Sequence, residues 1–364
     1  MGVRPVDFVL KKVFEDSIDY LQVLDENGKV DAALFPKDVD DKKILDMYKY
    51  LSFTRAVDTK CISLQRQGRL STYAPSIGEE ATQVGSAMAL RPNDMFVPNF
   101  RQHGTFIVRG LPLDMFFIYW RGFENGCMIP QNVHGFPYMV PVATQTLHAV
   151  GIAFAQKYAK RDVAVITYVG DGGTSEGDFY EAMNFAGVFK VPLVLIIENN
   201  QWAISVPRSR QSAAETLAQK GIAAGIKCLQ VDGNDVVAVY KAVSDAIADA
   251  KNGPTLIECV TYRVSMHTTS DDPTKYRSDD EVKKWIAKDP IARVKAYLTG
   301  KGLWNDSMEA GMQDDFKKEI DEAVEKAEAF KPDPKELFEH IYSFMPQSLK
   351  DEYDEALREN FWQG

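Results

Sequence analysis

Two short polar clusters combine residue types that suit a diphosphate and a divalent cation. They are Gly170-Asp171-Gly172 and Glu198-Asn199-Asn200. Glycine lets the backbone approach an anion closely, Asp171 offers a hard carboxylate oxygen, and Asn200 offers a neutral amide oxygen. Oxygen ligands together with phosphate groups suit Mg²⁺. A lone Gly-Asp-Gly would be an ordinary turn, but the Asn-Asn pair that follows favours a site for a metal-bound diphosphate.

Both clusters follow apolar runs that indicate buried strands. Residues 163–169 and 191–197 are short and rich in Val and Ile, which favours strands over helices. Between them, one helix is predicted from apolar residues at helical spacing, namely Phe179, Ala182, Met183 and Ala186. Ser175 and Asp178 are spaced as its capping box. This strand-helix-strand unit places both clusters at the carboxyl ends of parallel strands, where such sheets hold ligands.

The rest of the chain continues this alternation of strands and helices. We expect further helices at 41–67, 144–158, 213–224, 239–250 and 306–330, and further strands at 227–231 and 255–263. A second capping box, Ser76 and Glu79, precedes a helix that ends near Leu90, and residues 94–110 are expected to form a strand and a loop. These patterns predict an α/β fold in which a mostly parallel sheet is covered by helices on both faces.

The same patterns divide the chain into three parts. Residues 1–40 lack a clear period, so we expect an N-terminal arm that covers a neighbour and contributes no core element. Residues 41–300 are expected to form the α/β domain. Residues 301–364 are expected to form a C-terminal helical extension that packs on the same domain.

Composition excludes several classes of function. The net charge of −10 argues against nucleic acid as a partner, because phosphate neutralisation needs a basic stripe. No apolar run approaches the length of a membrane span, and the first residues carry charges where a signal peptide needs an apolar core, so we expect a cytoplasmic protein. The four cysteines lack C-x-x-C spacing, which argues against a zinc site and a disulfide framework.

Longer segments resemble a known family. Gly-Asp-Gly followed by Asn-Asn at this distance is similar to the thiamine diphosphate motif of transketolases, decarboxylases and 2-oxo acid dehydrogenases. The resemblance extends over most of residues 20–350 and is carried by RQGRLSTYAPSIGEEATQVG, GDGGTSEGDFYEAMNFAGVFKVP, ENNQWAIS, VDGNDVVAVY and TYRVSMHTTSDDPTKYRS. Together these segments resemble the alpha subunits of the pyruvate dehydrogenase first component, in the form found in Gram-positive bacteria. The fold expected from the resemblance is the diphosphate-binding domain of thiamine diphosphate enzymes.

The resemblance implies an activity, cofactors and partners. The activity would be oxidative decarboxylation of pyruvate with acetylation of a lipoyl group, and the cofactors would be thiamine diphosphate and Mg²⁺. A beta subunit would supply the glutamate that activates the cofactor, because one sheet of this length leaves no obvious room for a second cofactor-binding domain. The assembly would contain two alpha and two beta chains and would sit on a dihydrolipoyl acyltransferase core with lipoyl domains.

The resemblance also assigns residues to the cofactor and metal sites. Residues implied at the diphosphate are Phe100, Arg101, Gly170, Asp171, Gly172, Gly173 and His267. Arg101 suits this role because a guanidinium presents a fork of donors, whereas Phe100 stands where relatives usually carry tyrosine and can only pack. The backbone of Val140 and Val142 would meet the aminopyrimidine ring. Mg²⁺ would be bound by Asp171, Asn200 and the backbone carbonyl of Trp202.

Residues 264–280 form a polar loop after a predicted strand. A mobile surface loop has this composition, and so does a lid over an active site. By resemblance, His267 would lie near the diphosphate and the reacting substrate, and Tyr276 and Arg277 would help to fold the loop over the site. Some relatives are phosphorylated on a serine directly after this histidine, but Thr268 stands here, so regulation by that route is unsupported.

Two acidic residues match a proton path in relatives. Asp178 and Glu181 correspond to acids in a polar channel between paired active sites, although a capping carboxylate and an exposed helix charge are the simpler interpretations. His103 is expected to be structural. His134 is a weak candidate for a second active-site histidine, because relatives carry theirs nearer Asn125.

Other functions fit the same motifs. A branched-chain 2-oxo acid or acetoin dehydrogenase subunit would share them and differ in its preferred substrate. From another class, a non-catalytic phosphate-binding scaffold would share the sheet edge and show no Mg²⁺-dependent thiamine diphosphate binding.

Overall fold

Six parallel strands form the centre of the fold, in the order β1-β7-β8-β4-β3-β2. The computed structural model describes residues 12–333 and 335–359. The strand bounds are β1 Tyr20–Leu21, β2 Met95–Val97, β3 Val165–Gly170, β4 Leu193–Asn199, β7 Lys227–Asp232 and β8 Thr255–Val260. A separate antiparallel pair follows β4 and consists of β5 Trp202–Ala203 and β6 Val206–Pro207. The predicted α/β fold with a parallel sheet is confirmed.

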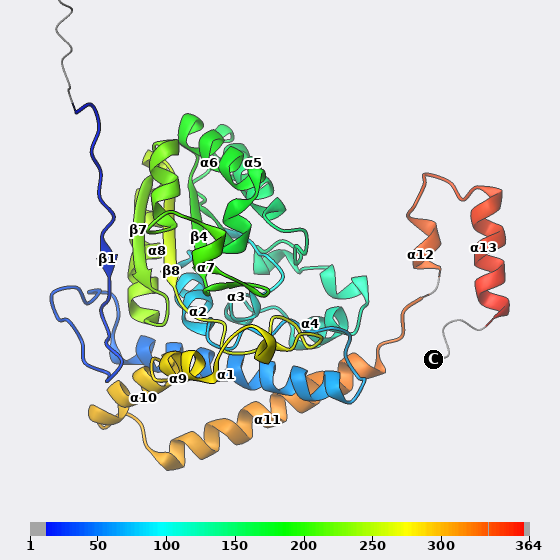
Figure 1. The fold of residues 1–364 in the computed structure, drawn as a ribbon. Coiled ribbons are helices and arrows are strands. Elements are labelled where there is room, and N and C mark those ends of the chain that lie inside the picture. The colour runs from blue at the N-terminus through cyan, green and yellow to red at the C-terminus, as the bar shows by residue number, and fades with distance from the viewer. Residues whose placement is uncertain (1–11, 334, 360–364) are drawn as a thin grey trace, which may run out of the picture.

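Helices cover both faces of this sheet (Figure 1). Successive side chains of a strand point to opposite faces. On one face, Val165 and Val169 of β3 belong to the same core as α5 (Thr144–Tyr158) and α6 (Gly177–Phe189). On the other face, residues such as Ile166 share a core with α2 (Glu80–Ala89) and α8 (Val236–Asp249). Because β3 is buried on both sides, consecutive positions of the strand are mostly apolar, and the hydroxyl of the buried Thr167 donates to the Val97 carbonyl at 2.9 Å.

The remaining helices surround this layer. Their bounds are α1 Asp41–Arg66, α3 His103–Val108, α4 Leu113–Trp120, α7 Arg208–Gln211, α9 Asp279–Ile286, α10 Pro290–Gly300, α11 Asp306–Ala329, α12 Glu336–Glu339 and α13 Gln347–Arg358. Short 3₁₀ segments occupy 124–127, 131–133, 172–175, 218–224, 250–252 and 273–275. Within the described residues, no helix combines the length and the apolar character needed to cross a membrane.

Several local predictions are wrong. The Ser175–Asp178 capping box does not form, because α6 begins after Glu176 and no side chain caps it. The Ser76–Glu79 box also fails, since the Ser76 hydroxyl donates to Asp58 at 2.7 Å instead. The stretch 213–224 is helical only from Ala218 and as a 3₁₀ segment. Residues 103–108 form α3 and not a loop. Each of these errors concerns either the hydrogen-bond partner of a polar side chain or the conformation of a short segment. Both depend on residues that are far away in the sequence.

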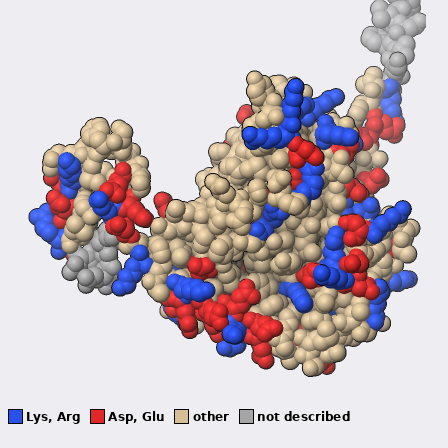
Figure 2. Space-filling model, turned by 180° about the vertical axis from the view of Figure 1, so that it is seen from behind, with Lys and Arg blue, Asp and Glu red and all other residues tan. Residues whose placement is uncertain are grey.

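The two terminal parts differ in how they join the sheet. β1 pairs with β7, and Val23 and Leu24 are buried, although no core element was expected there. Asp235 anchors them by accepting hydrogen bonds from both backbone N–H groups, at 2.7 and 2.6 Å. At the other end, α11 packs along α1 and α4, whereas α12 and α13 stand off from the body (Figures 1 and 2). The three-part division of the chain remains a prediction, and residues 1–11 of the arm lie outside the described residues.

Candidate active site

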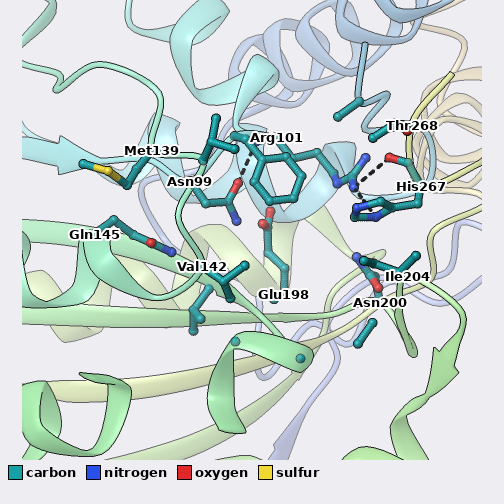
Figure 3. Close-up of a pocket in the computed structure, with 18 of the residues that line it drawn as sticks. Asn99, Arg101, Met139, Val142, Gln145, Glu198, Asn200, Ile204, His267 and Thr268 are labelled. Carbon is teal, nitrogen blue, oxygen red and sulfur yellow. Dashed lines mark hydrogen bonds between the residues drawn. The ribbon is translucent and has the colours of Figure 1, made fainter. Parts of the chain in front are cut away.

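A cavity of about 770 Å³ lies at the carboxyl ends of β3 and β4. Gly170 of β3 pairs with Glu198 of β4, so the chain segments that follow both strands emerge side by side. As a result, Asp171 and Asn200 both line the cavity. Arg101 and His267, which lie far from them in the sequence, also line it, and Figure 3 shows both together with Asn200. The sheet thus places the two polar clusters together, as the strand-helix-strand pattern predicted.

The glycines of the first cluster have no space for side chains. A Cβ atom on Gly172 would lie 2.6 Å from the Cβ of Ala203, and one on Gly173 would lie 2.5 Å from Cγ2 of Val169. Both glycines line the cavity, so their backbone is directly accessible to a ligand. This close approach of backbone to ligand is what a diphosphate site requires.

Asp171 is a buried carboxylate with an unused oxygen. Its side chain is 1% exposed, and its Oδ2 finds no hydrogen-bond partner among the described residues. Burial, followed by the nearby Glu79 carboxylate, raises the pKa of Asp171 to about 7. Such a group is costly to bury without a partner, which is the chemistry that a bound cation would satisfy.

Asn200 is held with its amide in one orientation. Its Nδ2 donates to Oε1 of Glu79 at 3.1 Å, and its Oδ1 accepts from the backbone N–H of Trp202 at 3.3 Å. The carbonyl of Trp202 accepts from Nη1 of Arg263 at 2.9 Å. No cluster of three or more His, Cys, Asp or Glu side chains with metal-binding geometry occurs in the described ranges. The donors therefore fit Mg²⁺ only together with oxygens from a bound phosphate.

Two arginines surround His267. Nη2 of Arg101 lies 3.2 Å from Nδ1 of His267 and also donates to its carbonyl at 3.1 Å, as the dashed lines in Figure 3 show. Nη1 of Arg263 lies 3.4 Å from the same Nδ1. Because a guanidinium only donates, Nδ1 must accept and the proton of the neutral ring sits on Nε2. Burial first, then both arginines, lower the pKa of His267 to about 3.

The loop that carries His267 is folded and braced. Arg277 donates to the carbonyls of Arg263, Val264 and Ser265. The hydroxyl of Tyr276 donates to Oδ2 of Asp271 at 2.5 Å and accepts from Arg263 at 2.9 Å. The same Asp271 oxygen accepts from the backbone N–H of His267 at 2.8 Å. Tyr276 and Arg277 thus hold the loop in place without lining the cavity.

Apolar residues complete the wall. Phe100 lines the cavity, and its ring meets that of His267 edge to face, with centroids 5.9 Å apart. Val140 and Val142 also line it and remain more than half exposed. Ile204 adopts φ of 54°, a strained conformation for a β-branched residue, and its side chain borders the cavity near Asn200 (Figure 3).

Some candidate residues lie elsewhere. Asp178 and Glu181 lie on α6 outside the cavity lining, half-buried and exposed respectively. His134 also lies outside the lining. His103 is fully buried, with its ring nitrogens 2.9 Å from the hydroxyl of Tyr138 and 2.8 Å from the carbonyl of Ala74. The structure therefore supports a structural role for His103.

Three charged residues that line the cavity were not assigned a role at the site from the sequence. Glu79, Glu198 and Arg263 are buried and line the cavity. Burial and Glu79 raise the pKa of Glu198, whose Oε1 has no partner among the described residues. For Glu198 and Arg263, the available signal in the sequence was a charged residue at the end of an apolar strand. For Glu79, the only local pattern was its spacing from Ser76, which wrongly predicted a capping box.

The parallel sheet and the polar cavity at its strand ends define an α/β protein whose cavity residues fit an anion together with a cation. Residues 48–335 match the model of the family described as dehydrogenase E1 component, and the chain belongs to this family.

Curated relatives agree with this family. The chain is 43% identical over 350 residues to the protein named pyruvate dehydrogenase E1 component subunit alpha from Staphylococcus aureus strain Mu50, covering 94% of this chain and 95% of the relative. It is 43% identical over 336 residues to the protein of the same name from Acholeplasma laidlawii, covering 91% and 97%. For the protein of that name from Staphylococcus epidermidis, the identity is 42% over 344 residues, covering 93% of each.

Proposed function

We propose that this chain is the alpha subunit of a pyruvate dehydrogenase first component, an oxidoreductase that decarboxylates pyruvate and acetylates a lipoyl group. Family membership and the names of the relatives support this assignment. The single observation that carries it is the unpartnered Asp171 oxygen beside Asn200, in a cavity that Arg101 and His267 also line. A scaffold that bound phosphate alone would have no use for a buried carboxylate without a partner.

The residues present fit thiamine diphosphate with Mg²⁺. Arg101 and the backbone of 170–173 would hold the diphosphate, and Asp171, Asn200 and the Trp202 carbonyl would hold the cation. The Trp202 carbonyl now accepts from Arg263, so this contact would be shared or exchanged on metal binding. Thiamine diphosphate, when bound, supplies a carbon nucleophile and an electron sink.

The chain's own side chains orient the reactants and handle protons. His267 offers a neutral ring with its proton on Nε2, so it can donate to a substrate oxygen without bringing a positive charge. Arg277 and Tyr276 keep the loop closed over the cavity and limit the entry of water. A proton path through Asp178 and Glu181 stays a proposal that needs the neighbouring chains, because neither residue lines this cavity.

A beta subunit is proposed to complete the site. Val140 and Val142, at the end of the cavity assigned to the aminopyrimidine ring, are 59% and 55% exposed. A wall this open would be closed by another chain, and the acid that activates the ring is proposed to come from there. Assembly as two alpha and two beta chains, docking on an acyltransferase core, and a cytoplasmic location remain predictions.

Reconstitution tests the proposal. The chain alone is expected to be inactive, and mixing it with its beta partner should give Mg²⁺- and thiamine diphosphate-dependent decarboxylation. A panel of pyruvate, branched-chain 2-oxo acids and acetoin, with a lipoyl domain as acceptor, should show the highest kcat/KM for pyruvate. Preference for another substrate would reassign the enzyme within the family, and absence of cofactor binding by the assembled chains would overturn the proposal.

A further inference from the structure

Glu79 is a buried carboxylate that touches the metal and diphosphate sites at once. Glu79 is 1% exposed and directly precedes the first residue of α2. Its Oε1 accepts from Nδ2 of Asn200 at 3.1 Å and lies 3.7 Å from Nε of Arg101. Glu79 does not cap α2, and the same oxygen, Oε1, makes both of these contacts.

The backbone explains why the carboxylate reaches the site. Gly78 adopts φ of 103°, and a Cβ atom there would lie 2.1 Å from the carbonyl of Tyr262. The hydroxyl of Thr261 donates to the Gly78 carbonyl at 2.8 Å, and the N–H of Val264 donates to the Ile77 carbonyl at 3.0 Å. These two hydrogen bonds hold the turn before α2 against the residues that follow β8. The turn therefore places Glu79 next to Asn200.

Hydrogen-bond chemistry then fixes the Asn200 amide. A carboxylate oxygen accepts from the Nδ2 side, and the backbone N–H of Trp202 donates to the Oδ1 side. Rotating the amide by half a turn would set donor against donor at Trp202 and acceptor against acceptor at Glu79. Only one orientation satisfies both neighbours, and it leaves Oδ1 as the atom able to bind a cation.

We propose that Glu79 is a positioning residue of the cation site, which orients the Asn200 amide for metal binding and holds Arg101 beside it. Groups that orient metal ligands commonly change metal affinity by about 10- to 100-fold when they are removed. This inference rests on the proposed function, since it concerns the Mg²⁺ that accompanies thiamine diphosphate.

The test compares two replacements of Glu79. Glu79→Leu removes the acceptor, whereas Glu79→Gln keeps an acceptor oxygen for Asn200 and removes only the charge. Mg²⁺ is titrated by calorimetry into the assembled alpha and beta chains at saturating thiamine diphosphate. We expect the dissociation constant for Mg²⁺ to rise about tenfold or more in Glu79→Leu and to change by less than about threefold in Glu79→Gln.

Controls separate this role from a general loss of structure. Glu80→Gln is the matched control, because the neighbouring buried Glu80 pairs with Arg55 and lies outside the cavity lining. Glu80 also accepts from the Gly78 N–H at 2.9 Å, and glutamine keeps an acceptor oxygen for that bond. Glu80→Gln should leave Mg²⁺ affinity unchanged even where it lowers the thermal midpoint. Each metal-free variant is melted first, and Glu79→Ala replaces Glu79→Leu if the larger side chain prevents assembly.

The outcomes are distinct. Unchanged Mg²⁺ affinity in both Glu79→Leu and Glu79→Ala would overturn the inference, and so would an equal loss in Glu79→Gln, since charge and not orientation would then matter. If the wild-type assembly itself showed no Mg²⁺-dependent binding of thiamine diphosphate, the proposed function would fail and not the role of Glu79 alone.

Discussion

The core and the cavity of this chain each contain a histidine and an aspartate, and the pKa values of the two pairs are shifted in the same way. In the core, burial is the main cause that lowers the pKa of His103 to about 3 and raises the pKa of Asp58 to about 7. In the cavity, His267 and Asp171 again have pKa values of about 3 and about 7. A shifted pKa therefore does not distinguish the functional site from the core.

Hydrogen bonding distinguishes them. Both oxygens of Asp58 accept hydrogen bonds, from the hydroxyl of Tyr73 and from the backbone and hydroxyl of Ser76. Both ring nitrogens of His103 are also partnered. In the cavity, Oδ2 of Asp171 is unpartnered, and the described residues offer Nε2 of His267 no hydrogen-bond partner. Between these two pairs of residues, unused hydrogen-bonding capacity is what separates the cavity from the core.

The largest expected effect follows from Asp171→Ala. Removing the unpartnered carboxylate should weaken Mg²⁺-dependent cofactor retention by at least about 100-fold, since a metal ligand contributes several kcal/mol. The melting temperature of the metal-free chain should change little, because the Asp171 oxygen that faces the cation site has no hydrogen bond to lose. Asp162→Ala, an exposed carboxylate on the surface, is the control. Full activity of Asp171→Ala would contradict the metal assignment.

His267→Ala should lower kcat by about 100-fold or more, because the neutral ring would no longer donate a hydrogen bond from Nε2 to charge that develops on a substrate oxygen in the cavity. Cofactor affinity is expected to fall much less than kcat, since Arg101 and the backbone of 170–173 would still hold the diphosphate. Steady-state kinetics and cofactor titration of the assembled enzyme would measure both. His134→Asn is the control, as asparagine tolerates the left-handed φ of 53° at this position. If His134→Asn lowered kcat as much as His267→Ala, the assignment of His267 as the active-site histidine would be contradicted.

His103→Leu should act on stability and not on the chemistry. The change leaves the Tyr138 hydroxyl and the Ala74 carbonyl without their partner, which costs about 2–4 kcal/mol of unfolding free energy. Denaturant unfolding at neutral pH measures this loss, and kcat per folded enzyme should stay within about threefold of wild type. A folded, stable variant without activity would place His103 in the site.

Acid should reduce the difference between wild type and His103→Leu. The pKa of His103 in the folded chain, about 3, lies below its unfolded value of 6.5, so the unfolded chain binds the proton more readily. The stability from the neutral ring is therefore complete above pH 6.5 and is lost as pH falls toward 3. The slope is at most about 1.4 kcal/mol per pH unit. Unfolding curves at several pH values test this, and a constant difference would contradict it.

The smallest effect is expected for Tyr276→Phe. Losing the hydroxyl removes contacts to Asp271 and Arg263, which together stabilise the closed loop by about 1–2 kcal/mol. Limited proteolysis within 264–280 should become several-fold faster, and kcat/KM should fall by up to about tenfold. Tyr158→Phe, an exposed tyrosine, should change neither. An unchanged proteolysis rate for Tyr276→Phe would show that other contacts hold the loop.

How much of the candidate site the sequence predicts depends on how far apart the contacting residues are in the sequence. Asp171 and Asn200 come together because each directly follows a strand of one strand-helix-strand unit, and the apolar pattern reveals both strands. Arg101 and His267 were assigned by resemblance alone. Glu79 was interpreted as a capping residue, and its true partner Asn200 is 121 positions away. No local pattern encodes a contact of this length.

The sequence by itself determined the parallel α/β sheet, the edge of the sheet where the cavity lies and the oxygen-bearing side chains at that edge. Those features depend on periodicity and on residue chemistry, which are local. Tertiary structure alone decided which buried polar groups are satisfied and which are left free. The amide orientation of Asn200, the tautomer of His267 and the contacts of the Glu79 carboxylate all depend on atoms that meet only when separate segments pack together.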